Sequence, residues 1–133
     1  MSIQRTVAAF LVLAITGGCA TTSPRPTRSE FEDIPVPQGL TYQVSESTII
    51  ESPAVKAARL VYRGRLEVSS LSDAMRATLE TNGWRYVSST SVDDVTKLVY
   101  EKSGSSLEVR LIDGWWFTYV ELTASRSLQQ ATK

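Results

Sequence analysis

Few residues of this chain could do chemistry near neutral pH, and the most informative is its single cysteine, Cys19. The sequence contains no histidine, the side chain that most often serves as a general acid or base in enzymes. It also lacks a glycine-rich phosphate loop, a Gly-x-Ser-x-Gly sequence and any spacing typical of metal ligands. We therefore expect no enzyme active site, no cofactor and no metal site. A Ser/Lys or paired-carboxylate site stays open, because no pattern selects or rejects one.

The residues in front of Cys19 have the composition of an export signal. Arg5 is followed by the apolar run 7–15, and the small residues Gly17 and Gly18 directly precede the cysteine. This run is too short to span a bilayer, which takes about 20 residues of helix, but it fits the hydrophobic region of a secretory signal peptide. The pattern resembles the lipobox of bacterial lipoproteins, in which the cysteine is acylated and becomes the mature N-terminus.

This resemblance implies that residues 1–18 are a cleaved signal peptide and that Cys19 carries palmitate-type acyl chains on a membrane. Two or more such chains hold a protein stably on a bilayer. Thr16 departs from the family pattern, which usually has an aliphatic residue three positions before the cysteine. By similarity to enteric lipoproteins, Ala20 in place of Asp implies the outer membrane, with the domain facing the periplasm. An ordinary or uncleaved signal peptide that ends near a cysteine is the alternative.

Length and charge indicate one small domain on a tether. The chain has 133 residues, and loss of residues 1–18 leaves 13 basic and 14 acidic side chains, because only Arg5 is removed. A net charge near −1 gives no reason to expect a nucleic-acid partner. Residues 19–33 are small, polar and proline-containing, so we expect a lipidated N-terminus and a flexible linker that reaches roughly 45 Å when extended. The expected domain covers residues 34–125, and residues 126–133 are expected to form a disordered polar tail.

A single helix is predicted close to the middle of the domain. Ser70 and Asp73 fit a capping box at its start, and Asn82-Gly83 supplies a left-handed stop at its end. Arg76 and Glu80 lie four residues apart and are expected to form a solvated ion pair. One face of the helix is apolar, since these residues recur at helical spacing: Leu71, Ala74, Met75, Thr78 and Leu79.

Alternating apolar and polar residues predict strands on both sides of this helix. Residues 40–45 and 58–66 precede it, and residues 84–90 after it are also expected to form a strand. Three later strands should form an antiparallel meander with a hairpin turn at Asp113-Gly114: residues 97–102, 107–111 and 115–124. We predict a single small α+β domain of order ββαβββ, with one helix packed on a twisted antiparallel sheet of about five strands.

The last of these strands presents two rows of side chains. Trp116, Val120, Leu122 and Ala124 are expected to face the core. Trp115, Phe117 and Tyr119 form the opposite row, which one helix cannot cover, and this row is the candidate interaction surface for a protein, a glycan or a lipid. The alternative is that the row packs beneath the segment around Ile34 and Val36, or beneath the first strand.

Charged residues give two weaker candidates. Arg59, Arg63 and Arg65 form a basic row on the second strand, and they could contact a phosphate or carboxylate, or form cross-strand ion pairs on a wet sheet face. Asp93 and Asp94 are adjacent, but no array of oxygen ligands surrounds them, so we expect a turn there and no Ca²⁺ site.

These observations favour a non-enzymatic, membrane-anchored lipoprotein that docks on an envelope protein or supports an envelope assembly. The alternative is a binding module for a small ligand, glycan or lipid that uses the row of Trp115, Phe117 and Tyr119. A concave cleft beside Trp115 would favour a small ligand, whereas a flat sheet face would favour a protein.

Overall fold

The computed structural model describes Phe31 and residues 33–127, so Cys19 and the expected signal peptide lie outside the described residues. The described part forms one antiparallel sheet and one α-helix, α1 (Val68–Thr81). A short 3₁₀ helix, η2 (Val44–Glu46), interrupts the first part of the chain. The seven strands are β1 (Thr41–Tyr42), β2 (Thr48–Glu51), β3 (Val55–Gly64), β4 (Arg85–Val92), β5 (Val95–Lys102), β6 (Ser105–Asp113) and β7 (Thr118–Ser127).

The predicted order ββαβββ and the predicted sheet of about five strands are wrong. Three strands precede α1 and four follow it, in a sheet of seven. Strand β2 contains the adjacent pair Ile49-Ile50 and is mostly exposed, so it lacks the alternation that marks a half-buried strand. Strand β4 is a polar edge strand, and the predicted order left it out although its residues were expected to be extended. The protein is nevertheless a small domain with one helix on one sheet.

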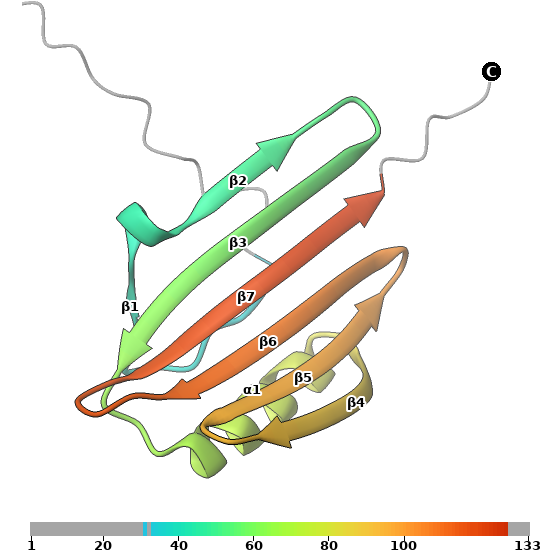
Figure 1. Ribbon diagram of the computed structural model, residues 1–133. Helices are drawn as coiled ribbons and strands as arrows, with labels where there is room; N and C mark the ends of the chain where they lie inside the picture. The colour runs from blue at the N-terminus through green and yellow to red at the C-terminus, as the bar shows by residue number, and fades with distance from the viewer. Residues whose placement is uncertain (1–30, 32, 128–133) are drawn as a thin grey trace, which may run out of the picture.

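The strands are arranged as a meander with one crossover (Figure 1). Strands β4, β5, β6 and β7 are neighbours in sequence order, which extends the expected three-stranded meander by one strand. Strand β3 pairs with β7, and β1 and β2 both pair with the other edge of β3. Helix α1 therefore connects β3 to β4 at the far edge of the sheet, and it crosses one face on the way.

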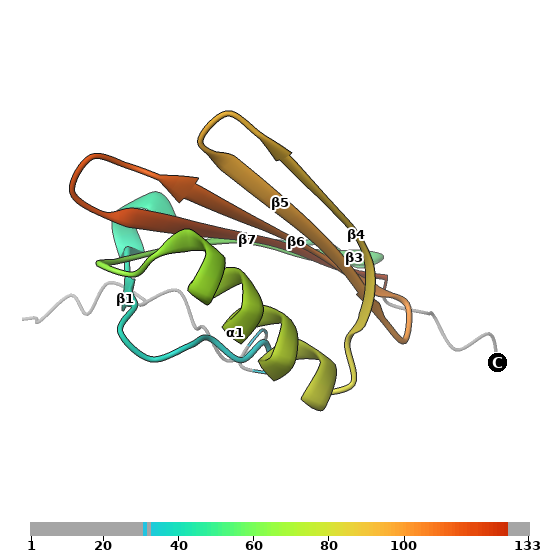
Figure 2. The same ribbon diagram turned by 90° about the horizontal axis from the view of Figure 1, so that it is seen from below.

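The core lies between this face and two covering segments. Figure 2 shows α1 and the chain before β1 on the same side of the sheet, while η2 lies on the opposite side. Residues Leu71, Met75 and Leu79 of α1 are at most 2% exposed, which confirms the apolar face of the helix. The alternation predicted for residues 58–66 is also confirmed, since Ala58, Leu60 and Tyr62 are buried and Leu66, just after β3, packs partly against the core. Burial of each large apolar side chain stabilises the fold by roughly 1.5–3 kcal/mol.

Two residues of the expected linker take part in the fold. Phe31 is 1% exposed and belongs to the core together with Ile34. Asp33 forms an ion pair with Arg126 of β7, and the Arg126 guanidinium also lies over the Phe31 ring. The segment around Ile34 thus covers the helix side of the sheet, and the linker meets the domain at the C-terminal end of β7.

The N-terminus of α1 differs from the predicted capping box. The helix begins at Val68, and the Glu67 carboxylate accepts hydrogen bonds from the backbone N–H groups of Ser69 (3.0 Å) and Ser70 (2.9 Å). An acidic N-cap satisfies amides that have no partner within the helix. The predicted stop is confirmed, because Gly83 has φ +84° and its N–H donates to the Glu80 carbonyl. The Arg76–Glu80 ion pair, at 3.0 Å, is also confirmed.

The Glu67 cap makes stability depend on acid pH. Hydrogen bonds from the Ser69 hydroxyl, and then from the backbone and hydroxyl of Ser70, lower the pKa of Glu67 from 4.5 to about 2. A lowered folded-state pKa stabilises the fold above the unfolded value, and this contribution is lost as the pH falls from about 4.5 through about 2. We expect Glu67→Gln to remove this part of the acid sensitivity in urea titrations between pH 2 and pH 6. The control Asp73→Asn should retain it, and parallel pH profiles for Glu67→Gln and the unsubstituted chain would contradict this role.

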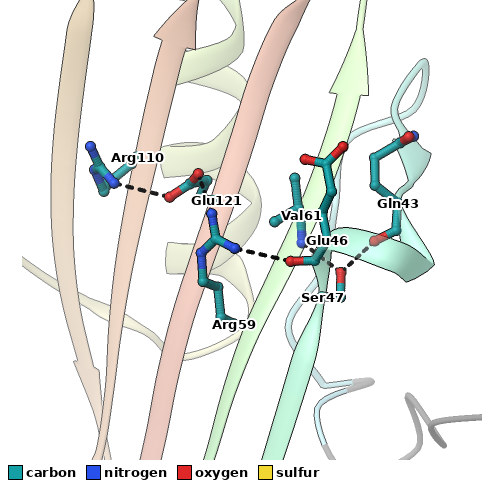
Figure 3. Close-up of polar contacts among 7 residues, drawn as sticks. All are labelled: Gln43, Glu46, Ser47, Arg59, Val61, Arg110 and Glu121. Atoms are coloured by element: carbon teal, nitrogen blue, oxygen red, sulfur yellow. Dashed lines mark hydrogen bonds and ion pairs between the residues drawn. The ribbon is translucent and has the colours of Figure 1, made fainter.

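The Ser47 side chain replaces strand hydrogen bonds at the edge of the sheet, between β1 and β2 (Figure 3). Here η2 arches away from β3, and the ladder of strand hydrogen bonds is interrupted beside Val61, which is only 1% exposed. The Ser47 hydroxyl accepts from the Val61 N–H (2.9 Å) and donates to the Gln43 carbonyl (2.8 Å). The Gln43 N–H donates to the Val61 carbonyl, so both backbone groups of this buried residue are satisfied.

Loss of the Ser47 hydroxyl should therefore cost more than loss of an ordinary surface hydroxyl. We expect Ser47→Ala to lower the free energy of unfolding by about 1–3 kcal/mol, because it leaves the buried Val61 N–H without an acceptor. The matched control is Ser91→Ala, since the Ser91 hydroxyl is exposed and contacts only the Thr96 hydroxyl at 3.1 Å; its expected change is within about 0.5 kcal/mol. Equal losses for both variants in chemical denaturation would count against this assignment.

Candidate functional site

The loop between β6 and β7 holds two adjacent tryptophans. The Gly114 N–H donates to the Phe117 carbonyl at 3.1 Å, so the chain reverses through Trp115 and Trp116. A Cβ on Gly114 would lie 2.6 Å from that carbonyl oxygen, so glycine is needed for this close approach. The turn is therefore two residues later than the predicted Asp113-Gly114 turn.

This shift changes the assignment of the last aromatic residues. Strand β7 begins at Thr118, three residues after the predicted start. Trp116 is 72% exposed, so its predicted place in the core is wrong, although Val120, Leu122 and Ala124 are buried as predicted. The predicted strand row of Trp115, Phe117 and Tyr119 does not exist either, because Trp115 lies in the loop at 90% exposure. Phe117 and Tyr119 are half-buried.

Two arginines approach this loop, Arg63 from the end of β3 and Arg65 from just after it. The guanidinium carbons of Arg63 and Arg65 lie 5.0 Å and 5.3 Å from the centre of the Phe117 ring, within the range of cation–π contacts. Both side chains are exposed. We call these two arginines together with Trp115, Trp116 and Phe117 the tip cluster. The β6–β7 loop, which carries the two tryptophans, is at the lower left of Figure 1, at the end of the hairpin.

The two arginines of the tip cluster differ from the other cations in one respect. Within residues 33–127, neither has a carboxylate within 4.0 Å or a hydrogen-bond acceptor. Every other Lys or Arg side chain in that range has an oxygen partner. The pairs are Lys56–Glu51, Arg59–Glu121, Arg76–Glu80, Arg85–Glu101, Lys97–Glu108, Lys102 with the Asn82 carbonyl, Arg110–Glu121 and Arg126–Asp33. The tip cluster thus carries the two cations of this region that are available to an external anion.

Arg59, the third arginine of the predicted basic row, is engaged within the protein (Figure 3). It donates to Glu121 Oε1 at 2.6 Å and to the Glu46 carbonyl at 3.0 Å. Arg110 donates to the other carboxylate oxygen of Glu121 at 3.0 Å. Glu121 therefore links β3, β7 and β6 on the outer face of the sheet, and cross-strand ion pairing accounts for Arg59.

This charge bridge should contribute to stability, because the Glu121 side chain is only 14% exposed. We expect Glu121→Gln to lower the free energy of unfolding by roughly 1.5–3 kcal/mol, since two charge-assisted hydrogen bonds are weakened. The matched control is Glu101→Gln, which breaks the Arg85 pair at 51% exposure of the glutamate side chain and should cost less than about 1 kcal/mol. Thermal unfolding that ranks the two variants in the reverse order would contradict this interpretation.

The hollows formed by the described residues lie away from the tryptophans. One, of about 450 Å³, is lined by Gly83, Arg85 and the β5–β6 turn. Another, of about 360 Å³, lies between Pro37, Arg65 and the start of α1. Neither is lined by Trp115, Trp116 or Phe117, although Arg65 of the tip cluster lines the second.

Other features of the chain offer little chemistry in the part that the structure describes. Burial raises the pKa of Tyr100 to about 12, and its hydroxyl has no hydrogen-bond partner among residues 31 and 33–127. Asp93 and Asp94 form the predicted turn between β4 and β5, with φ +51° at Asp93. Within the same residues, no group of three His, Cys, Asp or Glu side chains could hold a metal ion.

Comparisons with known proteins leave the function to be argued from the site itself. No protein-family model, curated protein or solved structure matches this chain. The one helix of the described part, α1, is too short and too polar to cross a bilayer. The lipidation candidate Cys19 lies outside the described residues.

Sequence reasoning missed Trp116 as a surface residue, and one signal could have revealed it. Adjacent strand residues point to opposite faces, so a strand through Trp115-Trp116 must expose one tryptophan on the wet face. A two-residue loop exposes both rings without burying a polar group. The close contact between Gly114 and the Phe117 carbonyl, which fixes this loop, has no signature in the sequence.

Proposed function

We propose that this chain is a non-enzymatic lipoprotein of the bacterial envelope, held on the outer membrane through acyl chains on Cys19. Its folded domain faces the periplasm and docks on another component of the envelope, or supports an assembly there. The observation that carries the docking role is the tip cluster, where Trp115 and Trp116 are 90% and 72% exposed. Large exposed aromatic side chains next to arginines are typical of binding surfaces, since both residue types dominate interface energetics.

The shape of the molecule supports docking more than uptake of a small ligand. Small-molecule sites are concave and enclose most of their ligand, whereas the tip cluster projects from the end of a hairpin. The hollow of about 450 Å³ lies elsewhere, and the one of about 360 Å³ meets the tip cluster at Arg65, away from the tryptophans. The flat outer face of the sheet carries paired charges, such as Lys97–Glu108 at 2.8 Å, and these need no external partner.

The position of the linker supports the same role. Phe31 and Asp33 contact Arg126, close to the C-terminal end of β7. The tryptophans of the tip cluster lie just before Thr118, where the other end of β7 begins. Eight residues of extended strand separate Thr118 and Arg126, a distance of roughly 27 Å. The described residues nearest the proposed anchor, Phe31 and Asp33, thus lie at the opposite end of β7 from the β6–β7 loop.

The anchor has a direct test in the native host or in an enteric bacterium. We expect the mature protein to begin at Cys19 with a mass that fits two or three acyl chains, and to sediment with outer-membrane fractions. Cys19→Ser should leave the protein unprocessed or release it from the membrane, whereas the matched control Thr21→Ser should behave like the unsubstituted chain. An unmodified thiol, or full processing and membrane retention of Cys19→Ser, would refute the anchor.

A further inference from the structure

We infer that the tip cluster contacts the headgroup layer of a phospholipid bilayer, with the rings of Trp115 and Trp116 at the interface and Arg63 and Arg65 on lipid phosphates. This inference rests on the proposed lipoprotein function, because the anchor keeps a bilayer within reach of the domain. It goes beyond that function by naming the surface on which the domain docks.

The exposure of the tryptophans fits an interfacial contact. Trp115 and Trp116 expose 90% and 72% of their surface at the end of a hairpin, where no other described element covers them. Tryptophan rings favour the boundary between water and hydrocarbon, because the ring is largely apolar and its N–H can still meet water or a headgroup. A projecting loop can enter a soft, planar layer without a matching pocket, whereas a rigid partner would need one.

The arginines of the tip cluster supply the contacts with lipid phosphates. Arg63 and Arg65 are exposed and lack an acceptor among residues 33–127, while both lie over the ring of Phe117, the residue that follows Trp116. A guanidinium group offers paired N–H donors that match phosphate oxygens. In a bilayer, phosphates lie directly outside the hydrocarbon, so apolar rings and free guanidinium groups on one small surface match that arrangement.

Acidic residues near the tip determine which side of it can face an anionic bilayer. Arg63 and Arg65 belong to the β3 side of β7, whereas Asp113 is on the β6 side, where its N–H donates to the Asp94 carbonyl. Glu67 follows the arginines at the start of α1, with its carboxylate already engaged by Ser69 and Ser70. We therefore expect the β3 side of the tip to face the lipid, and Asp113 to weaken the contact with anionic vesicles.

The geometry of the tether makes a weak contact sufficient. Residues 19–30 can extend over roughly 40 Å, which exceeds the roughly 27 Å between the linker end of β7 and the tip. The domain can therefore lie along the membrane that holds Cys19. Tethering makes the second contact intramolecular, with an effective concentration in the millimolar range for a short flexible linker. A stable acyl anchor and a weak contact of the tip then hold the domain against one bilayer.

The test uses the full chain with Cys19→Ser, so that no acyl anchor contributes, and measures tryptophan emission with vesicles. The probes are phosphatidylcholine vesicles and vesicles with one third phosphatidylglycerol. Each vesicle type is also prepared with brominated chains, and inorganic phosphate alone is the last probe. We expect a blue shift and quenching by brominated chains, with stronger binding to the anionic vesicles. Trp84, at 2% exposure, should be quenched little. Trp115→Ser with Trp116→Ser should abolish the response while circular dichroism and thermal unfolding remain unchanged.

Variants that remove arginines distinguish a contact of the tip with lipid phosphates from a general attraction of the domain to an anionic surface. Arg63→Gln with Arg65→Gln should weaken binding to anionic vesicles on the order of 30-fold, because each cation near such a surface contributes about a factor of five. The matched control, Arg76→Gln with Arg85→Gln, removes two cations away from the tip and should bind like the parent chain. Asp113→Asn should bind more tightly than the parent.

Four results would overturn the inference. The first is the absence of quenching in both kinds of brominated vesicle. The second is an equal response of the chain with Trp115→Ser and Trp116→Ser, in which Trp84 is the one tryptophan left to respond. The third is an emission change with inorganic phosphate alone, which would indicate a phosphate ligand. The fourth is crosslinking of position 115 to protein in cells, without quenching by lipid. None of these depends on Cys19, so failure of the tip and failure of the anchor are measured separately.

Discussion

One-sided burial of a single sheet is the constraint on which the structure depends. Helix α1 and the chain before β1 cover one face (Figure 2). The fully buried side chains of β6 and β7 belong to one core cluster with Phe31, Ile34 and the apolar face of α1. A lone helix could not cover seven strands, so the segment before β1 completes the layer. The apolar area buried there stabilises the domain in the absence of any disulfide, since the sequence has a single cysteine.

The opposite face of the sheet is in contact with water, so its polar and charged side chains must be satisfied by one another or by water. Glu121 joins Arg59 and Arg110 across three strands, and Ser47 satisfies the backbone of Val61 where the edge strand is interrupted. Charges on this face are therefore used within the protein. The tip cluster is the exception, because it combines two exposed tryptophans with two arginines that have no acceptor among residues 33–127. This contrast distinguishes a binding surface from an ordinary wet sheet face.

Much of the fold could be predicted from periodicity, because buried faces leave a regular pattern. The apolar face of α1, its stop at Gly83 and the inward row of β3 are all confirmed. Elements with little burial could not be predicted in the same way. Strand β2 pairs with the edge of β3 and is mostly exposed. The Glu67 cap was missed because Ser70 and Asp73 offered a more familiar motif. At the site, the arginines and Trp115 were identified from the sequence, but the position of the turn depends on a backbone contact of Gly114 that the sequence does not display.

The most direct test of the central claim is the solvent exposure of the three tryptophans in the folded chain without its acyl anchor. Incorporation of 5-fluorotryptophan gives one ¹⁹F resonance for each, and single Trp→Phe variants assign them. We predict that Trp115 and Trp116 show the full H₂O/D₂O isotope shift of an exposed ring and that Trp84, buried at 2% exposure, shows almost none. Protection of Trp115 and Trp116 within the isolated, monomeric domain would contradict one-sided burial and remove the tip cluster as a docking surface.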